Sequence, residues 1–178
     1  MKQVFSLRNA ALLDLCAVMN IERASFEPDI QETEAVFRRR IELFPDGFVL
    51  FTDSTGKTAG YLCSELWSSI PENPADFSVG HDISKMHRAD GKILYISSFA
   101  LLPEYRGCGN GARLFSTGLS FIKKRIQSVQ SVQSMVLLVN EQWTGARRIY
   151  DSYGFTRTAV LPDAFPHSAG IVMQFTSE

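Results

Sequence analysis

Apolar residues recur along the chain at two spacings, one typical of helices and the other typical of strands. Spacings of three and four residues predict helices at 10–22, 31–43, 112–126 and 143–153. Alternating or continuous apolar runs predict strands at 4–8, 47–53, 57–66, 92–102, 135–140, 155–161 and 170–176. The resulting order is β-α-α-β-β-β-α-β-α-β-β, which predicts a mixed α/β fold around one sheet.

Residues that favour turns separate these elements. Ser-Phe-Glu-Pro-Asp at 25–29 ends the first helix, Asp-Ser-Thr-Gly at 53–56 joins two strands in a hairpin, and Gly154 is a helix-stop signal. The stretch 68–90 is polar and contains two prolines. We interpret it as a long, lid-like insertion with one helical turn near 81–87.

The composition is that of one globular domain. The chain has 178 residues, of which 45% are hydrophobic and 21% charged, and no linker divides it, so we expect a single domain over 1–178. The net charge of -1 argues against a nucleic-acid partner. The arginine triplet at 38–40 is interpreted as a solvated helix face. The repeat Gln-Ser-Val-Gln-Ser-Val-Gln-Ser at 127–134 is interpreted as a polar helix end and loop.

Cysteine usage bears on the cellular compartment. Cys16, Cys63 and Cys108 are odd in number and widely spaced, which predicts a reduced, cytoplasmic protein without disulfides. The histidines are equally scattered, so we predict no metal site. The N-terminus lacks an apolar signal core and no apolar run is long enough to span a bilayer, so we expect no membrane association.

The stretch Leu-Leu-Pro-Glu-Tyr-Arg-Gly-Cys-Gly-Asn-Gly, at 101–111, contains the strongest chemical signal. Gly107, Gly109 and Gly111 follow Arg106 and open the predicted helix at 112–126. Glycine allows close backbone approach, and the free N–H groups at a helix N-terminus bind anions. The alternative is a tight strand-to-helix turn without a ligand, although a turn alone does not need three alternating glycines.

Two known phosphate-binding patterns fit this loop poorly. A P-loop ends in Gly-Lys-Ser/Thr, whereas Gly-Ala-Arg stands here at 111–113. The dinucleotide pattern G-x-G-x-x-G/A is met by Gly107, Gly109 and Ala112. That pattern should follow an apolar strand directly and open a βαβ series, but here Leu-Pro-Glu-Tyr-Arg intervenes and the loop lies behind a hairpin.

A third pattern, R-x-x-G-x-G/A, is matched by Arg106, Gly109 and Gly111. Together with Tyr-Ile-Ser-Ser-Phe-Ala-Leu-Leu before it and Ala-Arg-Arg-Ile-Tyr-Asp-Ser-Tyr-Gly-Phe at 146–155, the chain resembles the GNAT superfamily of acetyl-CoA-dependent N-acetyltransferases. The resemblance implies a single α/β (α+β) domain. It also implies a central mixed, mostly antiparallel sheet, flanked by helices and splayed between its fourth and fifth strands.

The resemblance also implies a coenzyme site. Loop amides would hold the pyrophosphate of acetyl-CoA, and the fourth strand would pair with the pantetheine arm. The implied coenzyme contacts are Phe99, Ala100, Leu101, Arg106, Gly107, Cys108, Gly109, Asn110, Gly111, Ala112, Asn140, Ala146 and Tyr150. Trp143 stands where many members have an asparagine that touches the pantetheine, and Asn140 is the candidate replacement.

Within the superfamily, the N-terminal half is similar to arylalkylamine (serotonin-type) N-acetyltransferases and their bacterial relatives. The similar stretches are Asn-Ile-Glu-Arg-Ala-Ser-Phe, Gly-Phe-Val-Leu-Phe, Gly-Tyr-Leu-Cys-Ser-Glu-Leu-Trp and Met-His-Arg-Ala-Asp-Gly. This implies a primary amine of a small molecule as acceptor. The alternatives are a protein or peptide acceptor and a CoA-binding sensor without turnover. The resemblance implies either a monomer or a homodimer.

Acetyl transfer from a thioester needs a neutral amine and benefits from a proton for the leaving thiolate. By resemblance Tyr150 is the proton donor to the CoA thiolate; the alternative is a core tyrosine. Tyr95 and Ser97 stand where the animal enzymes carry two histidines, so a histidine relay is not carried over. They could order a water chain, or alternate on an ordinary strand.

Other residues are candidates for the amine side. His87 and Glu65 are the nearest substitutes for a base or a cation-binding group; the alternatives are an exposed histidine and a solvated strand end. Phe26, Pro28 and Trp67 are the candidate acceptor-pocket residues, with ordinary core packing as the alternative for the aromatic pair.

Overall fold

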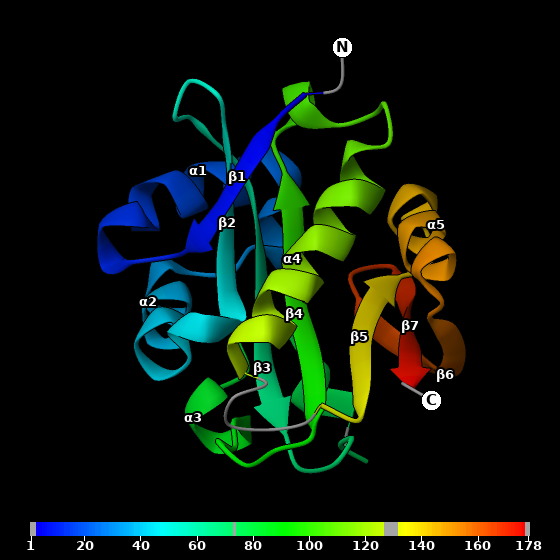
Figure 1. The fold of residues 1–178 in the computed structure, drawn as a ribbon. Helices are drawn as coiled ribbons and strands as arrows, with labels where there is room; N and C mark the ends of the chain where they lie inside the picture. The colour runs from blue at the N-terminus through cyan, green and yellow to red at the C-terminus, as the bar shows by residue number, and fades with distance from the viewer. Residues whose placement is uncertain (1–2, 73, 127–131, 177–178) are drawn as a thin grey trace.

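The computed structural model describes residues 3–72, 74–126 and 132–176. These residues form a seven-stranded sheet in the order β1-β2-β3-β4-β5-β7-β6, which confirms the mixed α/β prediction (Figure 1). All neighbours are antiparallel except β4 and β5, which are parallel. The strands are β1 (Phe5–Asn9), β2 (Phe48–Asp53), β3 (Thr58–Trp67), β4 (Ile93–Leu101), β5 (Ser134–Asn140), β6 (Thr156–Phe165) and β7 (Ser168–Thr176).

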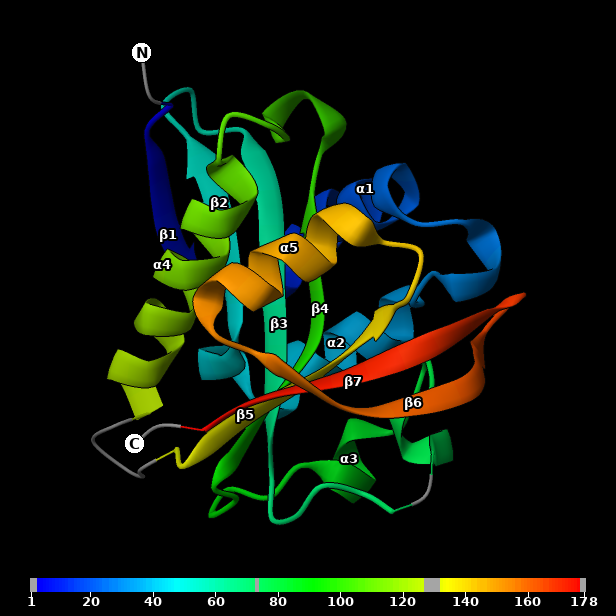
Figure 2. The same ribbon diagram turned by 90° about the vertical axis from the view of Figure 1, so that its right-hand side faces the viewer.

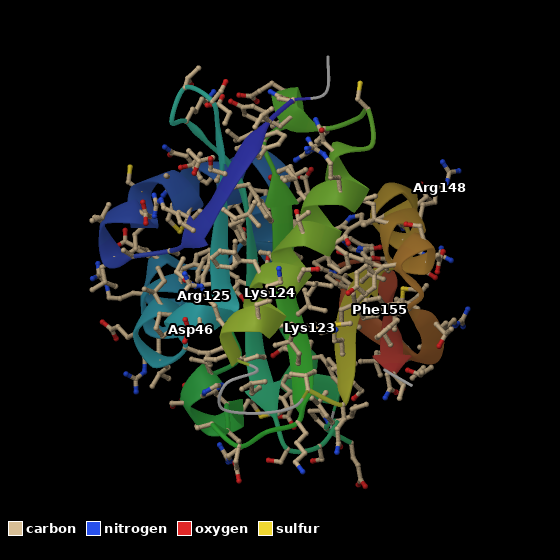
Figure 3. All side chains as sticks on the ribbon, in the orientation of Figure 1. Asp46, Lys123, Lys124, Arg125, Arg148 and Phe155 are labelled. Carbon is tan, nitrogen blue, oxygen red and sulfur yellow. The ribbon has the colours of Figure 1, made fainter. Side chains whose placement is uncertain are left out.

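Helices cover both faces of the sheet. They are α1 (Leu15–Ser25), α2 (Glu34–Leu43), α3 (Ile83–Met86), α4 (Asn110–Ile126) and α5 (Thr144–Tyr153). The first two helices lie on one face, and α4 and α5 on the other (Figure 1). The last turn of α4 carries Lys123, Lys124 and Arg125, whose charges complement the negative end of the helix dipole (Figure 3).

The first two helices begin later than apolar spacing predicts, because polar side chains set their starts. A short 3-10 turn, Leu12–Asp14, precedes α1, and Asp14 accepts a 2.8 Å hydrogen bond from the Ala11 N–H. Thr33 is the N-cap of α2, and its hydroxyl accepts a 3.4 Å hydrogen bond from the Val36 N–H. Threonine is a favoured N-cap, which explains why α2 begins at Glu34 rather than at 31.

The two C-terminal strands extend toward each other beyond the predicted bounds, since β6 ends at Phe165 and β7 begins at Ser168. Strand β6 continues through Pro162, and its register with β7 shifts between Leu161 and Phe165. Asp163 has φ 58° within this irregularity. Because β6 is an edge strand, a proline that lacks an N–H is tolerated there.

The sheet divides between β4 and β5, as the predicted splay requires. These strands pair only from Ile93–Ile96 with Ser134–Leu137. Beyond that point β4 continues with β3 as far as Leu101, and β5 continues with β7 as far as Asn140. Figure 2 shows β5, β7 and β6 running obliquely to β3 and β4.

A β-bulge at Ser97 changes which residues of β4 share a face. Ile96 pairs with Ser64 and Ser98 with Cys63, so Ser97 is the extra residue. Simple alternation places Tyr95 and Ser97 on one face. Because of the bulge, Ser98 lies on the same face of the sheet as Tyr95. Phe99 points toward the α4 side of the core.

The stretch 68–90 contains the predicted helical turn, now seen as α3, and a second turn at Pro74–Phe77. Phe77 packs against Trp67 and Tyr95, with ring centroids 5.4 and 5.7 Å away. The segment therefore packs against the sheet beside the site. The polar repeat predicted at 127–134 lies mostly outside the described residues.

Candidate functional site

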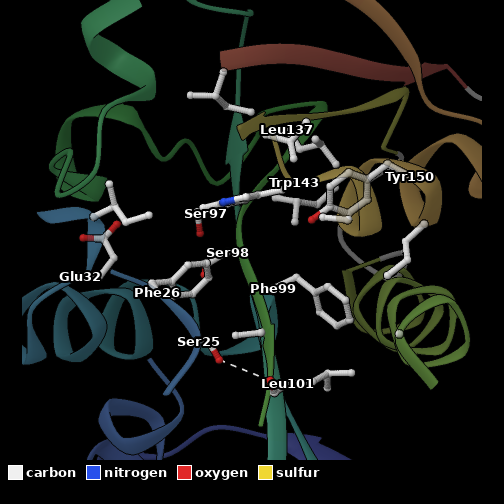
Figure 4. A pocket seen from close by; sticks show the side chains of 18 of the residues that line it. Ser25, Phe26, Glu32, Ser97, Ser98, Phe99, Leu101, Leu137, Trp143 and Tyr150 are labelled. Carbon is white, nitrogen blue, oxygen red and sulfur yellow. Dashed lines mark hydrogen bonds between the residues drawn. The ribbon is translucent and has the colours of Figure 1, made fainter. Parts of the chain in front are cut away.

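A cavity of about 620 Å³ opens where β4 and β5 part (Figure 4). Its lining joins the C-terminal end of β4, the glycine loop, α5, and the segments that follow α1 and β3. The predicted site residues that line it are Phe26, Tyr95, Ser97, Phe99, Ala100, Leu101, Arg106, Gly107, Gly109, Gly111, Ala112, Ala146 and Tyr150. The structure therefore brings most of the predicted coenzyme residues together.

The glycine loop has the backbone of an anion site. Gly107, Cys108 and Gly109 have φ angles of 79°, 49° and 77°, so the chain runs through consecutive left-handed residues. This run leads into the N-terminus of the 17-residue helix α4, whose first N–H groups have no intrahelical acceptor. The loop therefore fits a diphosphate. The Cys108 side chain is exposed and lies outside the cavity lining.

The third glycine serves packing. A Cβ on Gly111 would lie 2.7 Å from Cδ1 of Ile149, so glycine allows α4 and α5 to approach each other. Asn110 also acts within the protein, since its amide nitrogen donates to the Tyr105 carbonyl oxygen at 3.1 Å. Arg113 donates to the Asn110 side-chain oxygen at 3.0 Å. The Asn110 side chain thus stabilises the loop and does not line the cavity.

Arg106 ties the loop to two other elements. Its Nε donates to the Leu101 carbonyl oxygen at 2.8 Å, and its Nη2 donates to Ser25 Oγ at 3.1 Å. The Ser25 hydroxyl also donates to the Leu101 carbonyl oxygen, at 3.4 Å (Figure 4). Arg106 therefore fixes the end of β4 and the end of α1 beside the loop, in addition to placing a positive charge there.

Tyr150 lies on α5 with its hydroxyl in the cavity (Figure 4). The helix ends at Gly154, whose φ of 109° closes the last turn, with N–H bonds to the carbonyls of Tyr150 and Asp151. The Tyr150 ring packs on Phe115, with centroids 5.0 Å apart, and only 8% of the residue is exposed. Burial raises the pKa of Tyr150. Within the described part of the chain, no group hydrogen-bonds to this hydroxyl.

Trp143, and not Asn140, reaches the cavity. The Asn140 amide donates to Ser168 Oγ at 2.7 Å and accepts from the Gln142 N–H at 2.9 Å, so it joins β5 to β7. The Trp143 ring lies 5.6 Å from Phe26 and 5.4 Å from Phe165, centroid to centroid. We call Phe26, Trp143 and Phe165 the aromatic row; it links the end of α1, the start of α5 and the end of β6.

Tyr95 and Ser97 line the cavity but make different contacts. Tyr95 stacks on Trp67 at 3.9 Å and is 3% exposed, and burial raises its pKa. The Ser97 hydroxyl donates to the Cys63 carbonyl oxygen at 3.2 Å. Trp67 lies behind Tyr95, and neither Trp67 nor Pro28 belongs to the lining, so these acceptor-site predictions are not supported.

The histidine on the cavity is His81 rather than the predicted His87. His87 packs against Phe44 at 4.7 Å, outside the lining, and burial lowers its pKa. His81 Nε2 lies 2.5 Å from Glu65 Oε1 and its Nδ1 lies 3.2 Å from the Ser78 carbonyl oxygen. Glu65 is fully buried and also accepts from Trp67 Nε1 at 2.7 Å, which corrects the solvated-strand-end interpretation.

The same end of the cavity contains a group of buried polar residues that the sequence analysis did not identify. Arg40 donates to Glu32 Oε1 at 2.8 Å and is 1% exposed, so the arginine triplet is not a uniformly solvated face. Glu22 accepts a hydrogen bond from the Tyr61 hydroxyl, which lies 2.9 Å from Ser98 Oγ.

One signal for this group is present in the sequence. Leu15, Val18, Met19 and Glu22 occupy positions i, i+3, i+4 and i+7 of α1, so an acidic residue lies on the buried stripe of the helix. Glu22 is 1% exposed. Burial raises the pKa of Glu22, although the hydrogen bonds from Tyr61 and from the Glu32 N–H oppose the shift. A buried carboxyl group of this kind is typical of functional sites.

Two further properties concern metals and membranes. Among the residues that the structure describes, no three His, Cys, Asp or Glu side chains are grouped as a metal site requires. None of the described helices combines the length and apolar character needed to cross a bilayer.

Comparison with known proteins agrees with this geometry. The model of the Acetyltransferase (GNAT) family matches residues 15–155. A mycothiol acetyltransferase from Thermobispora bispora is 36% identical over 86 residues, which cover 46% of this chain and 28% of that protein. The chain thus aligns with under a third of that relative's length.

Two solved structures share the fold. The loading GNATL domain of CurA from Lyngbya majuscula superposes with a TM-score of 0.77 at 17% identity, covering 97% of this chain and 98% of that domain. The protein yncA from Salmonella typhimurium, solved with its cofactor acetyl-CoA, gives a TM-score of 0.67 at 19% identity, covering 97% of this chain and 93% of that chain.

Proposed function

Because the chain belongs to the acetyltransferase (GNAT) family, we propose that it transfers the acetyl group of acetyl-CoA to the primary amine of a small molecule. One observation carries the proposal. Among the described residues, one cavity joins the glycine loop, the part of β4 that does not pair with β5, the Tyr150 hydroxyl without a hydrogen-bond partner, and a polar end with buried carboxyl groups. These are the parts that thioester-to-amine transfer requires.

At the coenzyme end, the amides of Gly107, Cys108 and Gly109 and the first turn of α4 would hold the diphosphate of acetyl-CoA. From Ser97 to Leu101, no strand in the described part of the chain pairs with β4 on the β5 side, so its backbone groups are available to the pantetheine arm. Acetyl-CoA supplies an activated acetyl group. The chain's own residues orient it and exclude water.

Tyr150 is the proposed proton donor to the departing thiolate. Its hydroxyl has no partner within the described residues, and packing on Phe115 fixes the ring. The raised pKa keeps this phenol protonated throughout the neutral range. A dry site raises the proton affinity of a thiolate in the same direction, which offsets the rise in the pKa of the phenol.

The acceptor end favours a small cation with an apolar body, such as an arylalkylamine or a polyamine. Phe26 and Trp143 supply an apolar wall, while Glu22 and Glu32 place two carboxyl groups at the same end beside one guanidinium, that of Arg40. The aromatic row crosses this end between α1 and β6, which leaves less room for a peptide than an open groove does.

The test is acetyl-CoA-dependent thiol release with a panel of arylalkylamines, polyamines, aminoglycosides and short peptides. We expect turnover with one class of small amine. Turnover with peptides alone would move the acceptor to a protein N-terminus or lysine. Binding of acetyl-CoA without turnover on any acceptor would contradict the enzyme assignment and favour a CoA-binding sensor.

A further inference from the structure

We propose that Ser98, Tyr61 and Glu22 form a proton relay that removes the proton of the bound ammonium group before acetyl transfer. The inference rests on the proposed function and identifies the missing base. The three residues come from β4, β3 and α1, and they meet on the face of the sheet that carries the acceptor end of the cavity. Neither of the two β4 positions Tyr95 and Ser97 carries a histidine, so the base must come from other residues.

The direction of each hydrogen bond follows from the chemistry of the groups. An ionised Glu22 can only accept, so the single hydroxyl proton of Tyr61 points to Glu22 Oε2. The 2.9 Å contact between Tyr61 and Ser98 must then be donated by the serine. With its own proton committed to Tyr61, Ser98 Oγ presents lone pairs to the cavity, where it can accept a hydrogen bond from an ammonium N–H.

The bulge at Ser97 makes this arrangement possible. Without the extra residue, alternation would turn Ser98 to the α4 side of the sheet. With it, Ser98 pairs with Cys63 and lies on the same face as Tyr61. The bulge therefore brings a hydroxyl of the strand beside the coenzyme site into line with a carboxyl group on α1.

Other acid–base groups at this end have partners of their own. Glu32 Oε1 pairs with Arg40 at 2.8 Å, while Glu32 Oε2 is buried without a hydrogen-bond partner among the described residues. Both ring nitrogens of His81 face acceptors, Glu65 and the Ser78 carbonyl. Glu22 is the carboxyl group whose hydrogen-bonded neighbour leads on to a second hydroxyl in the cavity lining.

The step balances as follows. The ammonium N–H bond breaks and its proton goes to Ser98 Oγ, while the serine proton moves to Tyr61 Oη and the tyrosine proton to Glu22. The products are a neutral amine, both hydroxyls restored, and a protonated Glu22 that later returns its proton to solvent. Because burial raises the pKa of Tyr61 well above its usual range, the transfers are expected to be concerted, without a free tyrosinate.

Charged and titratable groups around Glu22 set the pH at which the relay works. They are Tyr61 of β3, the Glu32 carboxylate and Arg40 of α2, while Cys63 of β3 faces Tyr61. Burial raises the pKa of Glu22, the first of its causes, and Glu32 adds to the rise whereas Arg40 opposes it. A carboxyl group with a raised pKa is a better proton acceptor near neutral pH.

The experiment measures kcat and KM for wild type, Tyr61→Phe, Glu22→Gln and Ser98→Ala. Each is assayed with an alkylamine that is charged at pH 7 and with a fluorinated analogue of low pKa that is neutral there. With the charged amine we expect kcat to fall about 100-fold in the variants, as for loss of general base catalysis. With the neutral analogue, kcat of the variants should lie within a few-fold of the wild-type value. The same should hold for the alkylamine as pH approaches its pKa of about 10.

The matched control is Tyr105→Phe. Tyr105 also donates to a carboxylate, Asp53 at 2.6 Å, but it lies outside the cavity lining. We expect its kcat to stay within twofold of wild type for both amines. Circular dichroism checks that each variant folds, and Ser98→Ala retains a test of the relay if Glu22→Gln does not.

Two outcomes overturn the relay. Equal losses with the charged and the neutral amine at every pH would show that these residues only support the fold. Unchanged kcat in Tyr61→Phe and Ser98→Ala, beside an active wild type, would show that the proton leaves by another route. If the wild type itself acetylates no amine, the proposed function is wrong and the relay falls with it. This result can be told apart from the two outcomes above, in which the wild type is active.

Discussion

The proposed role of Tyr150 depends on one atom, the oxygen of its hydroxyl group. Tyr150→Phe keeps the packing on Phe115 and removes the hydroxyl that faces the cavity. A proton donor acts as the thiolate leaves, so we expect kcat to fall about 100-fold with little change in KM for acetyl-CoA. Steady-state kinetics over a pH series checks this. Unaltered turnover at every pH would contradict the assignment.

A glycine with a positive φ can serve ligand binding or only the fold, and the sequence pattern does not show which role Gly109 has. Gly109→Ala places a side chain at φ 77°, and relief of that strain would move the loop amides. We expect acetyl-CoA affinity to fall roughly tenfold, the equivalent of about 1.4 kcal/mol, measured by titration calorimetry. Gly56→Ala is the matched control, since Gly56 has φ 90° with open space around it, in the hairpin between β2 and β3. It should lower stability and leave affinity unchanged.

At the same scale, sequence reasoning found the residues that a local motif marks and missed those that meet only in three dimensions. The Arg106 loop and Tyr150 lie within short, recognisable patterns. Glu22, Tyr61 and Ser98 are far apart in the sequence, and ordinary strand or helix patterns surround each of them. The sequence prediction named His87, whereas His81 lines the cavity, because nothing in a polar, irregular stretch indicates which histidine faces inward.

At the scale of elements, strict alternation along β4 predicts the wrong face for Ser98, because of the bulge at Ser97. Apolar spacing located most of the secondary-structure elements, whereas the split between β4 and β5 was implied by the family resemblance. The spacing could not show that Ser97 is an extra residue, because a bulge depends on how β4 registers against β3. The helix starts were set by Asp14 and Thr33, which hydrophobic spacing does not weigh.

The aromatic row joins three elements, and its removal should change substrate choice. Trp143→Ala takes away the ring that lies between Phe26 and Phe165. We expect KM for the preferred small amine to rise about tenfold, since even one methylene in an apolar pocket changes discrimination by about 10–200-fold. Bulkier amines or short peptides should gain in relative kcat/KM. The amine panel measures this change.

A matched control for that experiment is Phe5→Leu, because Phe5 packs on Tyr105 outside the cavity. It should leave the order of substrate preference as in wild type. An unchanged preference in Trp143→Ala would show that the aromatic row does not border the amine.

For the whole molecule, the relay should carry a cost in stability. The pKa of Glu22 is raised in the folded state, so folding binds protons and the ionised carboxylate destabilises the native structure above that pKa. Below the unfolded pKa both states are protonated and the penalty vanishes. We therefore expect Glu22→Gln to raise Tm at pH 7 and to leave it unchanged near pH 4.

Thermal unfolding from pH 4 to pH 8 checks this, with Asp14→Asn as the opposite case. The hydrogen bond from Arg8 lowers the pKa of Asp14, so its stabilisation is present at neutral pH and is lost as pH falls. Loss of Asp14 should therefore lower Tm at pH 7. A Glu22→Gln variant that is less stable than wild type at pH 7 would contradict the expected sign.

The short junction between β4 and β5 has a consequence for the lifetime of the protein. Among the residues that the structure describes, β4 and β5 pair only between Ile93–Ile96 and Ser134–Leu137. A coenzyme arm seated along the free edge of β4 would act as a stand-in strand between them, and binding to the folded state alone resists opening by mass action. Cells short of acetyl-CoA should then hold a looser enzyme that proteases degrade faster, so that the amount of enzyme follows the supply of its own acetyl donor.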